Sequence, residues 1–212
     1  MADQIFAKGK LVLPDRLISD QLLVVRNGRI LEIGQPPRIP GSAQWIDAAG
    51  GYIVPGFVDL HVHGGDGADV MDGTAAAVET VCRAHLRHGT TTIIPTSTTG
   101  PPEQIQDFLS AVTAVRETEL AAMLPGVHLY GPYFAPNKVG CHSQSGCREP
   151  EAAEYAGYLA TCLVRIATCA AELPGAIEFY QAARAAGCLV TCGHSNSSWN
   201  EMQHAFNAGM RH

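Results

Sequence analysis

Two histidines, His61 and His63, are the residues whose types and spacing point most directly to chemistry. They lie in the run PGFVDLHVHGG, which covers residues 55–65. Side chains two residues apart on a β-strand point to the same face of a sheet, so we expect the two imidazoles side by side. Imidazole nitrogens suit Zn²⁺, Fe²⁺ and similar ions. The pair therefore predicts part of a metal site at the end of a strand.

A third histidine, His194, follows a second apolar run, residues 188–192, in the segment GHSN. If both runs are parallel strands of one barrel, their carboxyl ends meet at the mouth where barrel enzymes keep their active sites. We therefore predict that His61, His63 and His194 converge on one divalent metal ion. The histidines of the predicted helices are expected on the surface instead: His85, His88 and His204.

The elements that must position these residues alternate along the chain after residue 54. Five short apolar runs are typical of buried parallel strands: residues 57–62, 91–95, 126–130, 164–168 and 188–192. Helices are predicted between and after them, from Thr74 to Gly89, from Pro101 onward, from Pro174 to Gly187 and from Ser198 to Gly209. Such βα units indicate a doubly wound sheet or a (β/α)₈ barrel. At roughly 30 residues per unit, about five units fit, so a barrel would be incomplete.

The first 54 residues are predicted to form a small β-domain. Residues 5–13 are expected to make one strand-like run, and residues 45–47 a short one. Between them, Leu22–Arg26 and residues 29–33 flank Asn27-Gly28. Asn-Gly between two such runs predicts a tight hairpin, because both residues tolerate the positive φ of a type I′ turn.

Composition limits the classes of partner. The 212 residues carry a formal net charge of −6, which argues against a nucleic-acid groove or an anionic membrane surface as a partner. No apolar run reaches the roughly 18–20 residues of a membrane span, and the N-terminus does not have the pattern of a signal peptide. The seven cysteines have no disulfide-like spacing. We expect them to be small buried hydrophobes in a reducing cytoplasm.

Five segments, in order, carry a resemblance to a known family: PGFVDLHVHG, TTIIPTSTTG, HLYGPYFAPNKVGCH, ELPGA and GHSNSSWNEMQHAFNAGM. The chain resembles the N-acetylglucosamine-6-phosphate deacetylases of the amidohydrolase superfamily. The resemblance implies an α/β fold with a (β/α)₈ TIM-type barrel, incomplete here and covering residues 55–212. Residues 1–54 would be the N-terminal part of a small β-sandwich domain. It also implies a cytoplasmic homodimer when complete, and hydrolysis of N-acetylglucosamine 6-phosphate to glucosamine 6-phosphate and acetate.

The resemblance also assigns roles to residues. His194 corresponds to a metal ligand, and His61 and His63 match members that can hold a second ion. Cys141 and His142 occupy substrate-contacting positions for the amino-sugar phosphate. The cofactor implied is a divalent metal, Zn²⁺ first, with Fe²⁺ or Co²⁺ as alternatives.

Two features depart from the family pattern. Where the family has a glutamate ligand in HLEGP, this chain has Tyr130, a phenol that binds a metal only if the metal lowers its pKa from about 10. His128 in the same segment is a candidate contact behind the ligands. The resemblance places a further histidine ligand and the catalytic aspartate beyond His212. Within this chain we accordingly expect no catalytic residue. We therefore expect the chain to be a truncated form without deacetylase activity.

Two other functions remain open from the sequence. Another amidohydrolase, of the dihydroorotase or amino-acid deacylase kind, shares PGFVDxHxH, although GHSN and the His142 segment are closer to the sugar deacetylases. A non-catalytic fragment that binds metal or sugar phosphate is favoured by Tyr130. A screen of N-acetyl sugars against cyclic amides separates the first alternative from the family reading.

Overall fold

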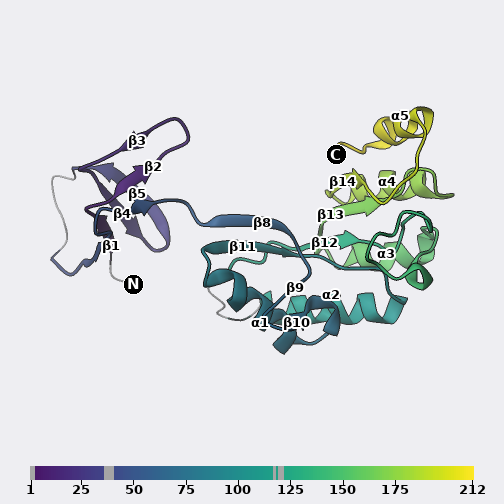
Figure 1. The fold of residues 1–212 in the computed structure, drawn as a ribbon, viewed down its shortest axis with the longest axis horizontal. Helices are drawn as coiled ribbons and strands as arrows, with labels where there is room; N and C mark the ends of the chain where they lie inside the picture. The colour runs from purple at the N-terminus through teal and green to yellow at the C-terminus, as the bar shows by residue number, and fades with distance from the viewer. Residues whose placement is uncertain (1–2, 36–40, 117, 119–121) are drawn as a thin grey trace. The chain divides into compact units, whose positions relative to one another are not determined.

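The computed structural model describes residues 3–35, 41–116, 118 and 122–212. It divides into two compact units, Met1–Gly56 and Phe57–His212. Figure 1 shows the first in purple and blue and the second from blue through teal and green to yellow. Each unit is described by itself.

The first unit contains two β-sheets. One has the order β5-β4-β1-β6, made of β5 (Arg29–Gly34), β4 (Leu22–Arg26), β1 (Gln4–Ala7) and β6 (Gln44–Asp47). The other has the order β3-β2-β7, made of β3 (Leu17–Ile18), β2 (Lys10–Val12) and β7 (Tyr52–Ile53). The predicted hairpin is confirmed, because β4 and β5 pair antiparallel and the turn residues Asn27 and Gly28 have φ angles of 49° and 73°.

The single strand predicted for residues 5–13 is wrong. Two strands form instead, and they belong to different sheets. Lys8, with a φ of 55°, turns the chain between them. A Cβ on Gly9 would lie 2.7 Å from Cδ1 of Ile53, so this turn depends on a glycine where β7 approaches.

The second unit is built on five parallel strands in chain order. They are β8 (Phe57–Val62), β11 (Thr90–Pro95), β12 (Val127–Tyr130), β13 (Val164–Cys169) and β14 (Leu189–Cys192). β8 pairs with β11, and β12 pairs with β13, which pairs with β14. Two parallel bridges, Thr92 to Met123 and Thr96 to His128, connect β11 to the segment that leads into β12 and to β12 itself. The five strands predicted from the sequence are all present, with bounds that differ by at most one residue.

Helices follow or separate these strands, and each packs against the next. They are α1 (Ala75–Leu86), α2 (Pro102–Arg116), α3 (Ala152–Ala160), α4 (Ala176–Ala185) and α5 (Trp199–Ala208). The predicted caps at Thr74 and at Ser198 with Glu201 are present. α3 was not predicted: its N-cap Glu151 makes no side-chain capping bond, and only two of its side chains, Tyr155 and Tyr158, are buried.

Short elements complete this unit. A hairpin of β9 (Gly64–Gly65) and β10 (Ala68–Asp69) follows β8, and the 3₁₀ helix η1 (Val70–Asp72) leads to α1. A second 3₁₀ helix, η2 (Gln144–Gly146), lies in the long connection from β12 to α3. That connection carries His142 and Cys141, so it matters for the site described below.

The core lies between the strands and the helices. The apolar spacing of α2 places four side chains on one face, and all four are buried: Ile105, Phe108, Leu109 and Val112. Burying such side chains contributes roughly 1.5–3 kcal/mol each. The second unit therefore owes its stability to a contiguous apolar core rather than to its surface ion pairs.

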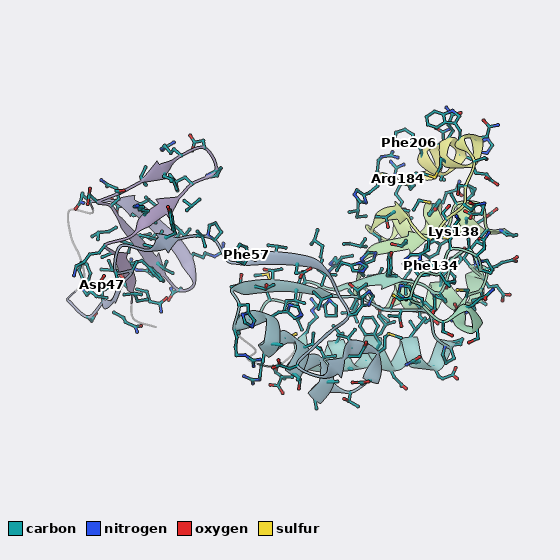
Figure 2. All side chains as sticks on the ribbon, viewed as in Figure 1. Asp47, Phe57, Phe134, Lys138, Arg184 and Phe206 are labelled. Carbon is teal, nitrogen blue, oxygen red and sulfur yellow. The ribbon has the colours of Figure 1, made fainter. Side chains whose placement is uncertain are left out.

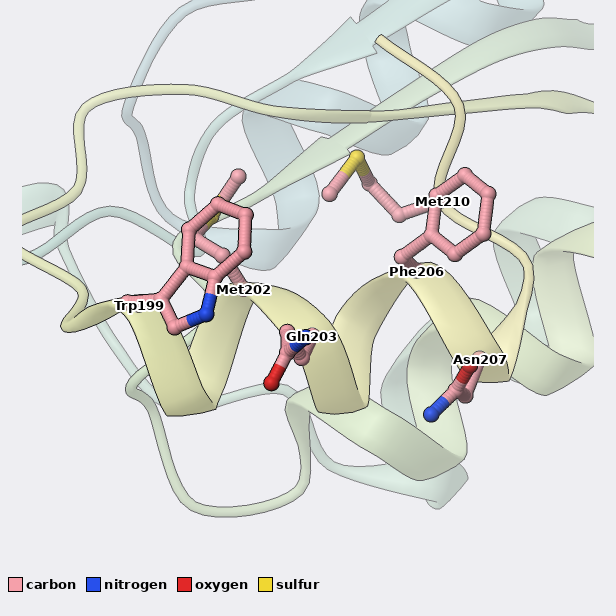
Figure 3. Close-up of a pocket in the computed structure, with 6 residues that line it drawn as sticks. All are labelled: Trp199, Met202, Gln203, Phe206, Asn207 and Met210. Atoms are coloured by element: carbon pink, nitrogen blue, oxygen red, sulfur yellow. The ribbon is translucent and has the colours of Figure 1, made fainter.

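α5 carries an apolar face that remains open. Trp199, Met202 and Phe206 lie along one side of the helix, and together with Met210, a buried residue that follows the helix, they line a pocket of about 320 Å³ (Figure 3). Trp199 is 75% exposed and Phe206 is 55% exposed. The buried side of the same helix consists of Ala205 and Ala208. This helix is therefore apolar on two sides, of which the α4 contact covers one.

The edges of the parallel sheet differ from each other. β14 is followed by residues that return beside it: Arg211 donates its N–H to Val190, and Cys192 donates its N–H to His212. An incomplete barrel is expected to leave the backbone groups of its last strand unpaired, and these two bonds show that this expectation is wrong to that extent. β8, at the other end, pairs with β11 alone and exposes Phe57, Val58 and Leu60.

The α/β class is confirmed, and among the described residues the strands do not close into a barrel. The search for a helix that is long and apolar enough to cross a membrane finds none among them. The expectation of buried cysteines holds for Cys82, Cys169 and Cys188 and is wrong for Cys141 and Cys162, which are exposed.

Candidate active site

The three predicted metal ligands lie at the carboxyl ends of the parallel strands, and the predicted substrate contacts Cys141 and His142 lie in the connection after β12. His61 is the last residue but one of β8, and His63 follows that strand directly. Tyr130 is the last residue of β12, and His194 comes two residues after β14. His142 reaches the same place from the connection between β12 and α3. Because parallel strands end at one edge of the sheet, residues far apart in the sequence meet there.

Tyr130 lies at the centre of a group that we call the histidine cluster. Its ring centroid is 4.5 Å from His61, 5.0 Å from His128, 5.2 Å from His194, 5.7 Å from His142 and 6.2 Å from His63. Cys141 is exposed beside this cluster. Burial raises the pKa of Tyr130, and the Cys141 thiol acts in the same direction. The phenol is therefore protonated at neutral pH.

His61 and His63 face each other through their outer nitrogens. The two Nε2 atoms are 3.0 Å apart. His63 donates its Nδ1–H to the carbonyl of Thr96 at 3.0 Å, which leaves its Nε2 as an acceptor when the ring is neutral. In the neutral cluster His61 therefore donates from Nε2 to His63.

His128 continues this chain of bonds behind His61. Its Nδ1 lies 3.4 Å from Nδ1 of His61, and its Nε2 lies 2.7 Å from the Thr168 hydroxyl, which in turn bonds Thr191. Since His61 donates from Nε2, its Nδ1 is the acceptor in the neutral ring, so the long 3.4 Å contact is a hydrogen bond only if His128 donates; the Leu60 carbonyl is a second acceptor for His128. The candidate role of His128 as a contact behind the ligands thus agrees with its place in the structure.

Burial sets the protonation state of the cluster. It lowers the pKa of His128 to about 3, with the neighbouring His61 adding to the effect. Burial is also the largest cause that lowers the pKa of His61 and of His142, and nearby histidines act in the same direction. Positive charges so close together repel one another, so these three rings are neutral near pH 7.

His194 is held from several sides. Its backbone lies in the left-handed region, with a φ of 51°. Its Nδ1–H donates to the Lys138 carbonyl at 2.6 Å, and its ring stacks on Phe134 with the centroids 4.1 Å apart. Figure 2 labels Phe134 and Lys138. Because Nδ1 is used, the bare nitrogen of the neutral ring is Nε2, as in many histidines that bind metals.

Gly193, the residue before His194, lies close to Thr168 and Tyr130. A Cβ on Gly193 would lie 3.1 Å from Cγ2 of Thr168 and 3.8 Å from the Tyr130 ring. A methyl group there would crowd the Thr168 side chain, whereas its distance to the Tyr130 ring is an ordinary contact. The glycine of the GHSN segment therefore brings His194 close to the cluster.

The donor set fits a divalent ion only in part. Zn–N bonds are about 2.0–2.1 Å, so nitrogens 3.0 Å apart can both reach one ion, and His61 and His63 meet this condition. Yet the described residues contain no group of three or more His, Cys, Asp or Glu side chains arranged to hold a metal ion. Tyr130, a neutral phenol, fills the centre where a carboxylate would supply a further donor.

A cavity of about 380 Å³ opens beside the cluster. Its lining includes Leu60, His61, His128, Tyr130, Thr168 and Thr191. Hydroxyls and imidazoles at the bottom of a partly apolar cavity provide both hydrogen bonds and a low-dielectric surrounding, which is what a small polar ligand requires.

Sequence reasoning missed three contributors to this site. Phe134 stacks on His194, the Lys138 carbonyl orients its ring, and Glu172 bonds the loop after it. A backbone carbonyl leaves no trace in a sequence, whereas the acidic residue in ELPGA could have been noted as the only charged group there. The surface placement of His85 is also wrong in part, because it is half-buried and donates to the Gly64 carbonyl.

Histidines gathered at the carboxyl ends of parallel strands are typical of the active sites of α/β enzymes, and sequence comparison narrows the class to a hydrolase family. Residues 52–212 match the Amidohydrolase family. The chain belongs to the amidohydrolase family, and the resemblance inferred from its motifs is confirmed.

Particular relatives are deacetylases of amino-sugar phosphates. The N-acetylglucosamine-6-phosphate deacetylase of Mus musculus is 33% identical over 88% of this chain and 48% of its own length. The N-acetylgalactosamine-6-phosphate deacetylase of Escherichia coli O157:H7 is 30% identical over 94% of this chain and 52% of its own. The crystal structure of N-acetylglucosamine-6-phosphate deacetylase from Pasteurella multocida superposes with a TM-score of 0.90 at 26% identity, covering 98% of this chain and 55% of that one. The chain thus spans about half the length of these relatives.

Proposed function

We propose that this chain carries the metal-binding and substrate-facing part of a hydrolase that removes the acetyl group from an N-acetylated amino-sugar 6-phosphate. The products would be acetate and the free amine, with N-acetylglucosamine 6-phosphate as the first substrate to test. The observation that carries the proposal is the cluster of five histidines at the carboxyl ends of parallel strands, in a chain similar to such deacetylases over most of its length.

Within this function the residues take separate roles. His61, His63 and His194 would hold the divalent ion, Zn²⁺ first and Fe²⁺ or Co²⁺ as alternatives. Such an ion lowers the pKa of a bound water and polarises a carbonyl. The Thr96 and Lys138 carbonyls orient the rings of His63 and His194. His142 and Cys141 would contact the sugar phosphate from the connection above the cluster.

The architecture we propose for the second unit is an arc of a (β/α)₈ barrel. Two observations support it. The strands follow one another in chain order without the reversal of a doubly wound sheet, and successive helices pack against one another. The two sheets of residues 1–54 would be the N-terminal part of a small β-sandwich domain.

Assembly and compartment follow from the same proposal. We propose a homodimer for the complete enzyme, by analogy with the family. A reducing cytoplasm is supported by the seven cysteines, all of which are free. Partners other than the amino-sugar phosphate are not proposed, and the net charge of −6 disfavours nucleic acid.

A second candidate function is binding without turnover. Tyr130 favours it, since a neutral phenol occupies the centre of the histidine cluster. In that case the chain would bind metal or sugar phosphate and release no acetate.

One experiment addresses both candidates. Binding of N-acetylglucosamine 6-phosphate to the 212-residue chain is followed by calorimetry with Zn²⁺, Fe²⁺ or Co²⁺ present, and acetate release is measured in the same samples. We expect binding that is lost in His142→Ala and kept in His204→Ala, whose side chain is exposed on α5. Because the chain spans half of its relatives, we expect turnover only when the remaining half of the fold is supplied. Binding of cyclic amides in preference to N-acetyl sugars would contradict the proposed substrate class.

A further inference from the structure

The loop between β14 and α5 carries His194 in a conformation that the residue does not adopt by itself. A non-glycine residue with a φ of 51° is unusual, and such residues persist where the surroundings over-determine them. His194 itself is held by segments that come earlier in the chain: its carbonyl accepts from the Ala135 N–H at 3.0 Å, its Nδ1–H donates to the Lys138 carbonyl, and its ring stacks on Phe134 and lies against Tyr130 and His142. Something must also hold the residues that follow it.

Glu172 makes those contacts. One carboxylate oxygen, Oε2, accepts from the Ser195 hydroxyl at 2.5 Å and from the Ser197 hydroxyl at 2.7 Å. The other, Oε1, accepts from the Asn196 N–H at 2.5 Å. Three consecutive residues after His194 are thus bonded to one carboxylate from a different loop.

Glu172 is itself fixed in place. It follows β13 directly after Ala170 and Ala171, which are both buried, and Ala170 donates its N–H to the Tyr133 carbonyl. Burial raises the pKa of Glu172, but the three donors outweigh it, and the net pKa lies below the ordinary value. The group is therefore an ionised acceptor at neutral pH, attached to the strand next to β14.

Capping of α5 does not explain this arrangement. The first turn of α5 is capped by Ser198 and Glu201, which bond each other reciprocally. The three hydrogen bonds of Glu172 do not involve Ser198 or Glu201. Its three bonds end at Ser197, before the helix begins, so they act on the loop that carries His194.

We propose that Glu172 is a positioning residue, which holds residues 195–197 so that the His194 imidazole stays against Phe134 and Lys138 in the histidine cluster. Its importance for binding and catalysis rests on the proposed function, whereas its effect on the position of His194 does not. Because Glu172 bonds three successive residues, it fixes the loop after His194 in one arrangement. Without them the backbone of His194 is free to return to negative φ, and its ring leaves the stack.

Histidine-selective ¹⁵N labelling and NMR of the metal-free chain test this directly. In the wild type, His194 should give a slowly exchanging Nδ1–H signal, from the bond to Lys138, and ring protons shifted by Phe134. We expect Glu172→Ala to abolish both signatures. Glu201→Ala is the matched control, since it removes an equal charge from the same part of the loop–helix junction and should leave both in place. Unchanged His194 signals in Glu172→Ala overturn the proposal.

A second variant covers the case in which Glu172→Ala fails to fold. Replacing Ser195 and Ser197 together by alanine removes two of the three donors and keeps the carboxylate. We expect the same loss of the His194 signatures, and their persistence would overturn the proposal as well. In these variants the Zn²⁺ affinity measured by calorimetry should fall about tenfold. This is the low end of the loss that follows when a residue that orients a metal ligand is replaced. If the wild type binds no Zn²⁺, the proposed function fails while the NMR result still decides the role of Glu172.

Discussion

At the scale of single residues, the protein packs five imidazoles around one phenol, and burial lowers the pKa of three of them, His61, His128 and His142. The hydrogen bonds run in one direction, from the Thr168 hydroxyl through His128 and His61 to His63 and on to the Thr96 carbonyl. An ion bound between His61 and His63 would take the place of the proton that they share. Under the proposed function, metal binding and proton release would therefore be coupled at this pair.

Tyr130→Glu is expected to raise the amount of bound Zn²⁺. The substitution places a carboxylate, a common Zn²⁺ ligand, at the centre of the histidine cluster, where the neutral phenol now stands. Elemental analysis after gel filtration measures the metal per chain. Tyr130→Phe is the control, which keeps the ring and removes the hydroxyl. Equal metal content in all three proteins would show that position 130 does not limit metal binding.

The buried His128 predicts how stability changes with pH. Its pKa is lowered from 6.5 to about 3 in the folded protein, so the unfolded chain binds more protons between these values. The free energy of unfolding should therefore fall as the pH is lowered from about 6.5 toward 3, by an amount on the order of 1 kcal/mol per pH unit. Denaturant unfolding at pH 7, 6 and 5 measures it. His128→Gln should flatten this dependence and His204→Gln should not, and parallel slopes in both would refute the assignment.

At the scale of elements, a phenylalanine is buried on one helix and exposed on another. Phe108 on α2 is fully buried in the core, whereas Phe206 on α5 is 55% exposed beside Arg211. Helices α1, α2 and α4 are amphipathic in the ordinary sense, with one face on the sheet. α5 instead leaves two large apolar side chains, Trp199 and Phe206, exposed (Figure 3).

Phe108→Ala should lower the free energy of unfolding by about 3–5 kcal/mol, because it leaves a cavity in a close-packed core. Phe206→Ala should change it by less than about 1 kcal/mol, since the ring already contacts water. Chemical denaturation of the two variants beside the wild type gives both values. Comparable losses in the two variants would mean that the exposed face of α5 is covered in solution.

At the scale of the whole molecule, the second unit has a contiguous apolar core and an edge strand, β8, that pairs on one side among the described residues. β8 pairs on one side only and exposes three apolar residues, Phe57, Val58 and Leu60. A strand edge with unpaired N–H and C=O groups and apolar side chains is a template for association. This edge and the open face of α5 make association the expected behaviour of the isolated chain.

We expect light scattering to show concentration-dependent association of the 212-residue chain. Val58→Lys together with Leu60→Lys should reduce it, because charges on an edge strand oppose pairing. Replacing two residues that are already exposed on the first unit, Ile30 and Leu31, by lysine is the matched control. A monodisperse wild-type monomer over the same concentrations would contradict the expectation.

Much of this architecture could be predicted from local patterns. The five parallel strands, the Asn27-Gly28 hairpin and the Ser198 cap of α5 depend on side chains close to one another in sequence, and these predictions were confirmed. The strand break at Lys8 was not predictable, because the contact of Gly9 with Ile53 comes from another strand. α3 was missed for a similar reason, since it has no side-chain cap and buries only two tyrosines.

The site divides in the same way. By itself the sequence determined that His61 and His63 share a face and that His194 follows another strand, because the period of a strand and the order of the elements are local properties. Tertiary structure alone decided that Tyr130 stands among the five imidazoles, that His128 lies behind His61, and that Glu172 holds the loop after His194. Most of these contacts join residues that are far apart in the sequence, and they depend on how the strands are placed side by side, which no short pattern records.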